Sequence, residues 1–218
     1  MVDTKLNIDI ASEPIGAGGS RICYPYPGGP DKCIKVHRSP EMLINRKLMR
    51  TFRAWLAGKF SLFNLNWHEY RFWQKYIQNN KIPELRVFLP HFHQLAKTGL
   101  GLALILECVR DDNGRISESL KSWYPKASRS DRNLALEQID ALKNIIVDHG
   151  LPCYDWNPNN FLVQYTCGSF QLKLIDFEAH LGNNELIPLS TFIPRLRRAK
   201  VRRRIERGLL SWLKQFED

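Results

Sequence analysis

The chain has 218 residues, of which 44% are apolar and 25% charged, a globular composition that suits one domain or two closely joined lobes. Its apolar runs are too short to cross a bilayer, and its N-terminus lacks the apolar core of a signal peptide. Its five cysteines include no Cys-x-x-Cys pair, which argues against a disulfide framework and a zinc knuckle. The net charge of +10 leaves nucleotide, phosphorylated glycan, anionic lipid and nucleic acid open as partners, and a reducing cytoplasm is the simplest location.

The first forty residues predict strands joined by turns. Apolar and polar residues alternate up to Ile10, and a glycine-rich turn over Ile15–Ser20 precedes a strand at Ile22–Tyr26. A Pro-Gly-Gly-Pro turn leads into a third strand, Lys32–His37. This pattern indicates two hairpins of one sheet.

The period changes to that of a helix from Glu41, where apolar and basic residues predict an inserted basic helix. A second helix is predicted over Trp67–Gln78. Pro83 and Pro90 flank a piece that reads as a strand, and Leu100–Cys108 is a strongly apolar strand.

The second half is richer in helices. Leu134 to Ile146 mark a long amphipathic helix closed by Gly150, and strands are predicted over Phe161–Tyr165 and Phe170–Ile175. A last helix places its apolar residues on one face: Phe192, Leu196, Ala199, Ile205, Leu209, Trp212, Leu213 and Phe216.

A β-rich first part followed by a helix-rich second part predicts an α+β fold with two lobes. We expect an N-lobe over residues 1–109, with a five-stranded sheet, the glycine turn and two helices. A reduced helical C-lobe over residues 110–218 would carry the loop after Gly150 and the last helix, and the natural boundary is the loop after Cys108.

Two short motifs in the second half carry the clearest chemical signal. Asp155 is followed by Pro158 and Asn160 and then by an apolar strand, which resembles the catalytic loop of kinases. Asp176 follows a second apolar strand and precedes Phe177, as in the metal-binding Asp-Phe-Gly. In phosphoryl transfer Asp155 would accept the hydroxyl proton, and Asn160 and Asp176 would hold Mg2+. The alternative is that these residues only shape turns.

The first half contains matching candidates for nucleotide binding. Gly16, Gly18, Gly19 and Ser20 lie between two predicted strands, where backbone N–H groups can approach phosphate oxygens without a clashing Cβ. Lys35 on the next strand resembles the kinase lysine that contacts the α- and β-phosphates. An ordinary turn and an edge lysine are the alternatives.

The carboxylate partner of Lys35 is expected on the following helix. We choose Glu69 over Glu41, which is too near Lys35 in sequence, and over Glu84, although a plain surface glutamate is the alternative. Glu107, at the end of the apolar strand, joins the predicted cofactor-binding residues.

The order of these motifs resembles one family, the PhoP regulatory network proteins of the YrbL type, a bacterial branch with a protein-kinase-like fold. The likeness covers nearly the whole chain except a stretch after His37 that looks inserted. It is carried by four segments: Gly19–Tyr24, Lys32–Lys35, Asn159–Leu162 and Leu186–Leu189. The resemblance implies an ATP site but names no substrate.

Several departures from the kinase pattern bear on function. Cys153 stands where kinases have His, Asn157 stands where they have Lys, and Glu178 replaces the Gly of Asp-Phe-Gly, as in kinases of aminoglycosides, choline and sugars. Few residues follow Asp176, which leaves little room for a peptide-docking platform. We therefore expect an ATP- and Mg2+-dependent kinase acting on a hydroxyl of a small molecule or glycan, such as a lipopolysaccharide sugar. The alternatives are a regulatory pseudokinase and a cationic adaptor.

Basic helices indicate the remaining partners. The last helix carries eight cationic residues: Arg195, Arg197, Arg198, Lys200, Arg202, Arg203, Arg204 and Arg207. Such a face is commonly just solvated, but its density favours an anionic partner. We expect an anionic membrane surface, which would make the protein peripheral on the inner membrane, and rank nucleic acid lower because no recognition motif occurs. His91 and His93 have no third ligand in view and are left unassigned.

Overall fold

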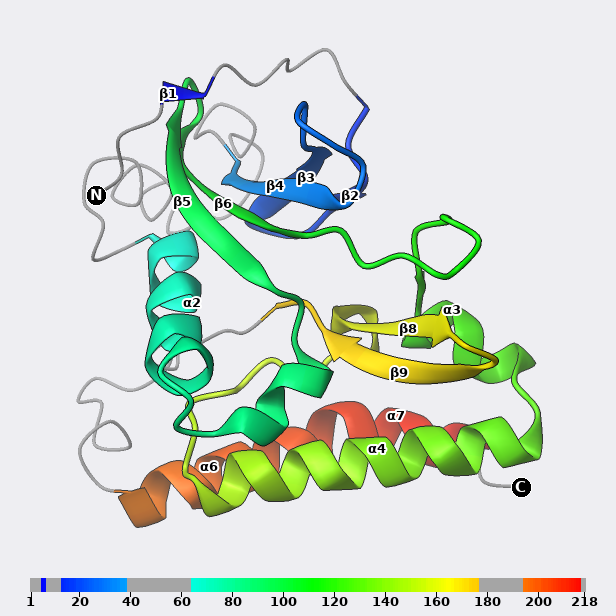
Figure 1. The fold of residues 1–218 in the computed structure, drawn as a ribbon. Helices are drawn as coiled ribbons and strands as arrows, with labels where there is room; N and C mark the ends of the chain where they lie inside the picture. Colours follow the sequence, from blue (N-terminus) through cyan, green and yellow to red (C-terminus); the bar gives the residue numbers. More distant parts are fainter. Residues whose placement is uncertain (1–4, 7–12, 39–63, 177–193, 217–218) are drawn as a thin grey trace. The chain divides into compact units, whose positions relative to one another are not determined.

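The computed structural model describes residues 5–6, 13–38, 64–176 and 194–216 (Figure 1). The chain divides into two compact units, a first unit over Met1–Lys81 and His91–Cys108, and a second unit over Ile82–Pro90 and Val109–Asp218. The segment Ile82–Pro90, which the sequence placed with the N-terminal half, therefore belongs to the second unit. The predicted inserted helix, Phe177, Glu178, Leu186–Leu189 and Phe192 lie outside the described residues.

The first unit is built on a six-stranded sheet in the order β1-β5-β6-β4-β3-β2. Neighbouring strands run antiparallel except β1 and β5, which are parallel. The sheet has one strand more than the five expected; β1 lies in the N-terminal segment that was expected to form a strand, whereas the two-residue β2 lies within the predicted glycine turn. The strands are β1 (Lys5–Leu6), β2 (Gly16–Ala17), β3 (Arg21–Pro25), β4 (Lys32–His37), β5 (Phe92–Thr98) and β6 (Gly101–Glu107).

The two faces of this sheet differ in chemistry because side chains alternate along each strand. One face is an apolar core, to which β4 contributes Ile34 and Val36, with exposures of 0% and 1%. The other strands add the rest of that core: Ile22, Tyr24, Ala96, Ala103 and Ile105. The alternate positions of β3 and β4 carry Arg21, Cys23, Cys33 and Lys35 on the opposite face.

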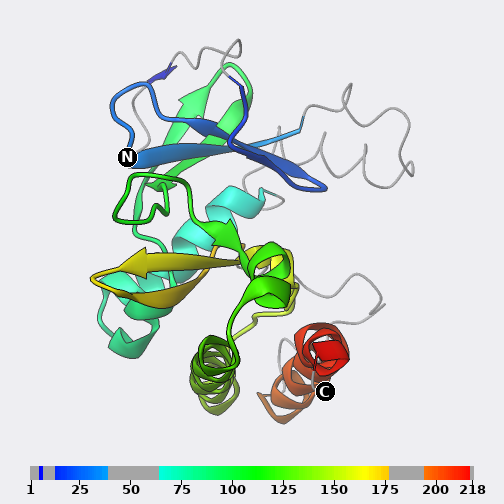
Figure 2. The same ribbon diagram turned by 90° about the vertical axis from the view of Figure 1, so that its right-hand side faces the viewer.

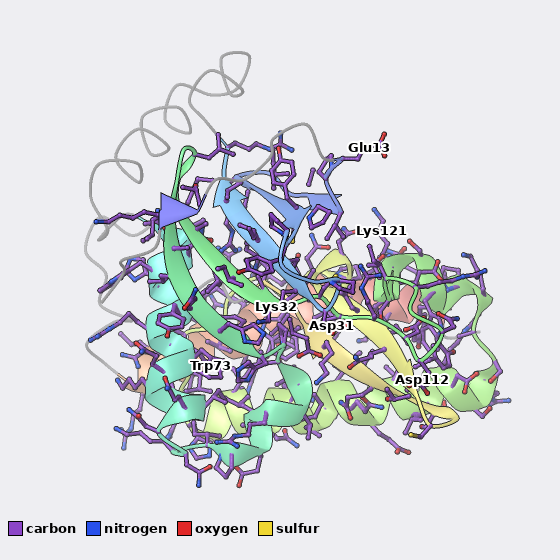
Figure 3. The ribbon with its side chains drawn as sticks, turned by 45° about the horizontal axis from the view of Figure 1, so that its top comes forward. Glu13, Asp31, Lys32, Trp73, Asp112 and Lys121 are labelled. Carbon is purple, nitrogen blue, oxygen red and sulfur yellow. The ribbon has the colours of Figure 1, made fainter. Side chains whose placement is uncertain are left out.

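Among the residues of the first unit that the structure describes, one helix packs on the sheet. It is α2 (Leu65–Trp73), continued by a single π-helical segment, η3 (Gln74–Gln78), where the sequence predicted one helix over Trp67–Gln78. Trp73, near the end of α2, stacks on Phe92 of β5 with ring centroids 6.1 Å apart (Figure 3). This aromatic contact helps to fasten the helix to the sheet.

A second, three-stranded sheet has the order β7-β8-β9 and belongs to the second unit. Its strands are β7 (Glu118–Ser119), β8 (Phe161–Thr166) and β9 (Ser169–Leu174). The turn between β8 and β9 is Cys167-Gly168, with φ of 52° and 79°, the positive values that a tight two-residue hairpin needs. The Asp112 carboxylate accepts a hydrogen bond from Cys167 N at 2.6 Å and holds the tip of this hairpin (Figure 3).

Helices lie beside this hairpin in both views (Figures 1 and 2). The longest, α4 (Arg129–Asp148), begins at the N-cap Ser128 and ends in a Schellman motif, in which Leu151 N donates to Ile146 O at 2.9 Å. Gly150 takes the left-handed conformation there, with φ of +59°. The other helical segments are α3 (Leu120–Trp123), η5 (Tyr124–Lys126), η6 (Pro158–Asn160), α6 (Pro194–Ile205), η7 (Glu206–Leu210), α7 (Ser211–Leu213) and η8 (Lys214–Phe216).

Two expectations about these elements are wrong. The segment between Pro83 and Pro90 is not a strand but a 3-10 helix, η4 (Pro83–Phe88), because proline fits the first helical turn, where an N–H would have no partner. The longest strand that the sequence missed is β5, which begins at Phe92, within the segment left unassigned around His91 and His93.

The apolar face of the last helix also differs from the prediction. Its buried positions recur every four residues: Val201, Ile205, Leu209 and Leu213. Leu196 is 45% exposed and Ala199 is exposed, because neither belongs to that series. Among the described residues, no helix is both long and apolar enough to cross a membrane.

Candidate active site

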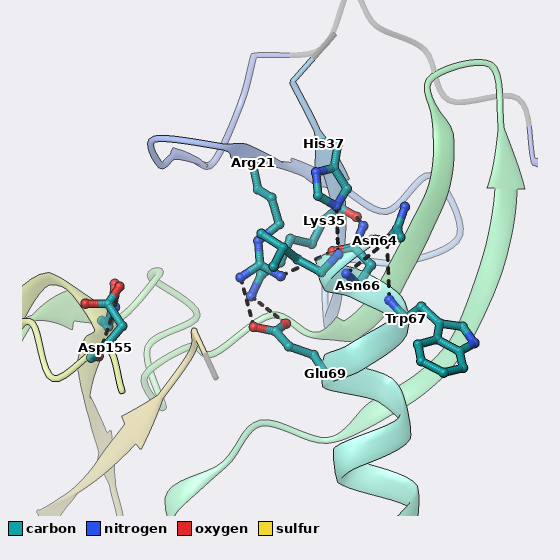
Figure 4. A network of polar contacts seen from close by, with 10 residues as sticks. Arg21, Lys35, His37, Asn64, Asn66, Trp67, Glu69 and Asp155 are labelled. Atoms are coloured by element: carbon teal, nitrogen blue, oxygen red, sulfur yellow. Dashed lines mark hydrogen bonds and ion pairs between the residues drawn. The ribbon is translucent and has the colours of Figure 1, made fainter. Parts of the chain in front are cut away.

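A buried charged cluster lies on the first unit's sheet, opposite the apolar core. The Lys35 Nζ is 3.2 Å from Glu69 Oε2, and the Arg21 Nη2 is 2.9 Å from Glu69 Oε1 (Figure 4). The side chain of Lys35 is 10% exposed, that of Glu69 2% and that of Arg21 6%. Two cations from strands β3 and β4 therefore share one carboxylate from α2.

Asn66 explains why α2 is held in this position. Its Nδ2 donates to the backbone oxygens of Lys35 at 2.8 Å and Leu102 at 2.9 Å, which ties the first turn of α2 to β4 and β6. Its Oδ1 accepts from Arg21 Nη1 at 3.3 Å. One amide group thus positions the helix, and with it Glu69, against the sheet.

The start of α2 is held in addition by its cap. Asn64 Oδ1 accepts from the backbone N–H groups of Asn66 and Trp67, and His37 Nε2 accepts from Leu65 N at 3.1 Å (Figure 4). These bonds satisfy N–H groups that a helix leaves unpaired at its N-terminus. The helix that carries Glu69 is therefore anchored at its N-terminal end.

Electrostatics in the cluster act mainly on the lysine. Burial lowers the pKa of Lys35 because it disfavours the charged ammonium, and the neighbouring Arg21 lowers it further. The Glu69 carboxylate opposes both effects. The protonation of Lys35 therefore depends on its two charged neighbours.

The glycine turn connects directly to this cluster, since Arg21 follows Ser20. Gly18 N donates to Arg21 O at 2.9 Å, and Arg38 Nε donates to Gly18 O at 3.0 Å. A Cβ at Gly16 or Gly19 would meet no atom within 4 Å. The fold therefore does not itself require glycine at these two positions, and their predicted role in covering phosphates stays a prediction.

Glu107 has a structural task at the end of β6. Its Oε2 accepts from His91 N at 2.8 Å, and its backbone N–H donates to His91 O at 2.8 Å. These bonds fix the entry into β5. A role for Glu107 in cofactor binding stays a prediction.

The second unit brings the other predicted residues to one end of the β8–β9 hairpin. Asn160 Nδ2 donates to Asp155 Oδ2 at 2.8 Å and to Asp155 O at 3.3 Å. The Asn160 backbone oxygen accepts from Ile175 N at 2.9 Å, and the next residue is Asp176, which is half-buried. Asp155 and Asn160 are therefore hydrogen-bonded at the end where the two strands open, and Asp176 follows β9 at the same end.

The loop that carries Asp155 is supported from two sides. Trp156 is 3% exposed and donates from its Nε1 to Cys153 O at 3.3 Å. Gly208, in the π-helical segment η7, approaches so closely that a Cβ would lie 2.6 Å from Trp156 O. The last helix thus sets the position of the residue beside Asp155.

The donor atoms of this end suit a hard divalent cation. Carboxylate oxygens of Asp155 and Asp176 and the amide oxygen of Asn160 are the ligand types that Mg2+ prefers. In the part of the chain that the structure describes, no three His, Cys, Asp or Glu side chains are grouped so that they could hold a metal. A metal here would therefore rest on the two carboxylates, the amide and further ligands such as phosphate oxygens.

The predicted cationic face is partly used inside the second unit. Arg197 Nη1 donates to Gly150 O at 3.3 Å, Arg198 Nη2 donates to Asp148 O at 2.7 Å, and Lys200 Nζ lies 5.0 Å from the centre of the Tyr154 ring. The two arginines thus serve the C-terminal carbonyls of α4. The other five members are exposed: Arg195, Arg202, Arg203, Arg204 and Arg207.

Sequence reasoning missed two residues of the first unit's cluster, Arg21 and Asn66. Arg21 could have been found, since it follows the glycine turn and alternates in step with Cys23 on β3. No local sequence pattern identifies Asn66, because the three hydrogen-bond partners of its side chain come from β3, β4 and β6.

Comparison with known proteins gives a family match and a structural match. A family model described as "PhoP regulatory network protein YrbL" matches residues 9–211. No curated protein matches the chain. Among solved structures, the chain is similar to "WaaP in complex with acyl carrier protein", with 14% identity, 94% of this chain and 86% of that chain covered, and a TM-score of 0.37, which is too low to establish a shared fold.

Proposed function

The chain belongs to the PhoP regulatory network family of the YrbL type, and on that premise we propose that it has a two-lobed protein-kinase-like fold and transfers the terminal phosphate of ATP, with Mg2+, to a hydroxyl group. The observation that carries this proposal is the buried ion pair between Lys35 on β4 and Glu69 on α2. A lysine on the third strand of the lobe, paired with a glutamate on the following helix, is the arrangement that kinases use to hold the α- and β-phosphates.

The first unit would contribute the nucleotide-binding residues. Lys35 would contact the α- and β-phosphates while Glu69 orients its ammonium group. Gly16, Gly18, Gly19 and Ser20 would offer backbone N–H groups to phosphate oxygens. Arg21 would keep Glu69 in place through its 2.9 Å ion pair.

The second unit would contribute the chemistry at the acceptor. Asp155 would accept the proton of the attacking hydroxyl, and the hydrogen bond from Asn160 would orient its carboxylate. Asn160 and Asp176 would hold Mg2+, which when bound neutralises charge on the phosphates.

The acceptor is proposed from the sequence around Asp176. Glu178 in place of glycine resembles the kinases of sugars and other small molecules rather than those of proteins. We therefore assign a hydroxyl of a small molecule or a glycan, with an envelope sugar such as one of lipopolysaccharide as the class to test first.

A second candidate function is a pseudokinase that binds nucleotide without turnover. The observation that favours it is Asn157, which stands at the place of the kinase lysine and whose Oδ1 instead accepts from Asn159 N at 3.0 Å. Cys153, at the place of the kinase histidine, is fully buried. Both residues therefore serve the loop rather than a substrate in this structure.

Nucleotide binding can be tested by thermal unfolding with and without ATP and Mg2+. A ligand that binds only the folded state at a hundredfold excess over its Kd adds about 2.7 kcal/mol to the free energy of unfolding. We expect this stabilisation for the unmodified chain and for the control Lys97→Met, an exposed lysine on β5, and its loss in Lys35→Met. An unmodified chain that ATP and Mg2+ do not stabilise would overturn the proposal.

Turnover separates the two candidate functions. With an accepted hydroxyl compound, ADP release should fall by about 10²- to 10⁴-fold in Asp155→Asn, which is the usual contribution of a general base. Stabilisation by ATP should persist in this variant. ATP binding without ADP release over a panel of sugars and glycans would select the pseudokinase.

A further inference from the structure

Three cysteines meet on the face of the first unit's sheet that also carries Lys35. Cys23 on β3 is paired in register with Lys35 on β4, and Cys33 lies two residues before Lys35, so Cys23 and Cys33 are diagonal neighbours on the same face. Cys33 is paired with Leu106, which places it diagonal to Cys108 on its other side. Cys33 is therefore the central thiol of a row across three chain segments.

The three thiols differ in access to solvent. Cys33 and Cys108 are both 6% exposed, whereas Cys23 is only half-buried. Cys23 also pairs in register with Gly16, next to the glycine turn. A small oxidant in solution would therefore reach Cys23 before either neighbour.

Hydrogen bonding and charge separate the thiols in reactivity as well. The Cys33 thiol donates to Glu107 O at 3.6 Å. The neighbouring Cys33 thiol lowers the pKa of Cys23, and the charges of Lys35 and Arg21 lower it further, against the effect of burial. The pKa of Cys33 is raised by its bonds to Cys108 and Cys23 and by burial. Since the thiolate is the reactive form, Cys23 is the nucleophile and Cys33 its protonated neighbour.

We propose that Cys23 is a peroxide-reactive thiol and that Cys33 resolves its oxidised form into a reversible disulfide between β3 and β4. The row of thiols on one face, with the accessible member beside a buried one, carries this assignment. Among the described residues, no cluster suited to a metal includes these cysteines.

The chemistry takes place in two displacements. The Cys23 thiolate attacks one oxygen of hydrogen peroxide, the O–O bond breaks, and hydroxide leaves and is protonated to water, so that Cys23 becomes a sulfenic acid. The Cys33 thiol then gives up its proton and attacks the Cys23 sulfur, and the departing hydroxide takes that proton to form a second water. Two thiols are oxidised and one peroxide is reduced to two waters.

Strand geometry makes the bridge reversible. Diagonal neighbours in an antiparallel pair have Cα atoms roughly 7 to 8 Å apart, beyond the range of about 4.4 to 6.8 Å that most disulfides span, so a bridge requires the backbone to move. Bridging therefore draws β3 and β4 together near the end of their ladder, where Pro25 pairs with Cys33 just before the connecting turn. A strained bridge of this kind is readily reduced, as suits a regulatory site.

The test begins with the full chain treated with equimolar hydrogen peroxide, blocked with iodoacetamide, digested without reductant and analysed by mass spectrometry. We expect a linked pair of peptides containing Cys23 and Cys33 that dithiothreitol separates. In Cys33→Ser, dimedone should trap a sulfenic acid at Cys23. The matched control is Cys167→Ser, which removes an exposed thiol at the β8–β9 turn and should leave the bridge unchanged.

A measurement without any substitution guards against variants that fail to fold. In the native chain, the rate of alkylation of Cys23 by iodoacetamide should rise with pH at a midpoint below 9.0, the ordinary value for a cysteine. The proposal is overturned if Cys167 is oxidised while Cys23 stays reduced, if the bridge joins Cys33 to Cys108, or if the Cys23 midpoint is not below that value.

The effect of the bridge on nucleotide binding rests on the proposed function. The bridge should abolish stabilisation by ATP and Mg2+, and dithiothreitol should restore it. Since the linked peptides are detected by mass alone, a chain that binds no ATP but forms the bridge contradicts only the proposed function. A chain that binds ATP equally with and without the bridge contradicts only this regulatory effect.

Discussion

The two units hold their candidate residues by different means. In the first unit, Arg21, Lys35 and Glu69 are charged groups removed from water, each at most 10% exposed, and they are fixed by ion pairs. In the second unit, Asp155 and Asn160 are half-exposed and fixed by hydrogen bonds to each other and to the adjacent backbone.

The difference determines how each unit responds to substitution. When a buried charge loses its partner, no water takes the partner's place, so the unit becomes less stable. When a half-exposed side chain loses a hydrogen bond, water can bind it instead, so loss of that bond should affect function more than stability. Three changes test this contrast, in order of expected effect on stability, and a fourth tests the electrostatics of the first unit.

Glu69→Gln should be the most destabilising. It removes the carboxylate that Arg21 and Lys35 share, and breaking a buried pair in this way costs about 3 to 5 kcal/mol in the free energy of unfolding. Urea unfolding followed by circular dichroism measures the loss. The double variant Glu69→Gln/Lys35→Met also removes the charge of Lys35 and should be more stable than Glu69→Gln alone. An unchanged urea midpoint in Glu69→Gln would show that the ion pairs contribute nothing to stability.

Gly208→Ala should have an intermediate effect in the second unit. Alanine favours a helix over glycine by up to about 1 kcal/mol, but its Cβ would lie 2.6 Å from Trp156 O, and overpacking of this kind costs about 1 to 3 kcal/mol. The clash should outweigh the propensity and displace the loop that carries Asp155. The control is Gly99→Ala, where a Cβ meets nothing within 4 Å; equal thermal midpoints for the two variants would contradict the close packing.

Asn160→Ala should destabilise only slightly. Its two hydrogen bonds to Asp155 are partly exposed, and a typical bond contributes about 1 kcal/mol. Phosphotransfer, if the proposed function holds, should nevertheless fall far more than in the neighbouring control Asn159→Ala. A loss of stability as large as that of Glu69→Gln would remove the contrast between the units.

Arg21→Gln tests the electrostatics of the first unit through pH. Burial and the Arg21 charge both lower the pKa of Lys35, while Glu69 and Cys23 oppose them, so removal of Arg21 should raise that pKa. Titration of the lysine 13Cε signals by NMR measures this shift, and an unchanged Lys35 midpoint would show that Arg21 does not act on it.

The sign of the linked stability effect follows from the same pKa. The folded-state pKa of Lys35 lies below its ordinary value of 10.5, so the unfolded chain binds more protons in the window between the two values. The contribution of Lys35 to the free energy of unfolding therefore rises with pH across that window. Arg21→Gln should narrow the window, because it brings the folded-state pKa closer to the ordinary value.

Local pattern was sufficient for the elements whose periodicity is regular. The strand Lys32–His37 was predicted with the bounds that the structure has, because a Pro-Gly-Gly-Pro turn precedes it and marks where it begins. The helix closed by Gly150 was predicted for a similar local reason, since a left-handed C-cap favours glycine. By contrast, β5 and the 3-10 helix at Pro83–Phe88 were missed, because packing decides the state of short apolar segments.

The candidate site divides in the same way. Residue type and order along the chain were enough to select five candidates, because phosphoryl transfer needs a cation, carboxylates and an amide, and their order resembles that of the kinase motifs. The candidates are Lys35, Glu69, Asp155, Asn160 and Asp176. Only the tertiary structure shows that Asn66 ties α2 to two strands, that Arg21 shares Glu69 with Lys35, and that Gly208 lies against Trp156. The physical reason is that these contacts join segments far apart in sequence, and the burial that gives them their energy arises only when the chain has folded.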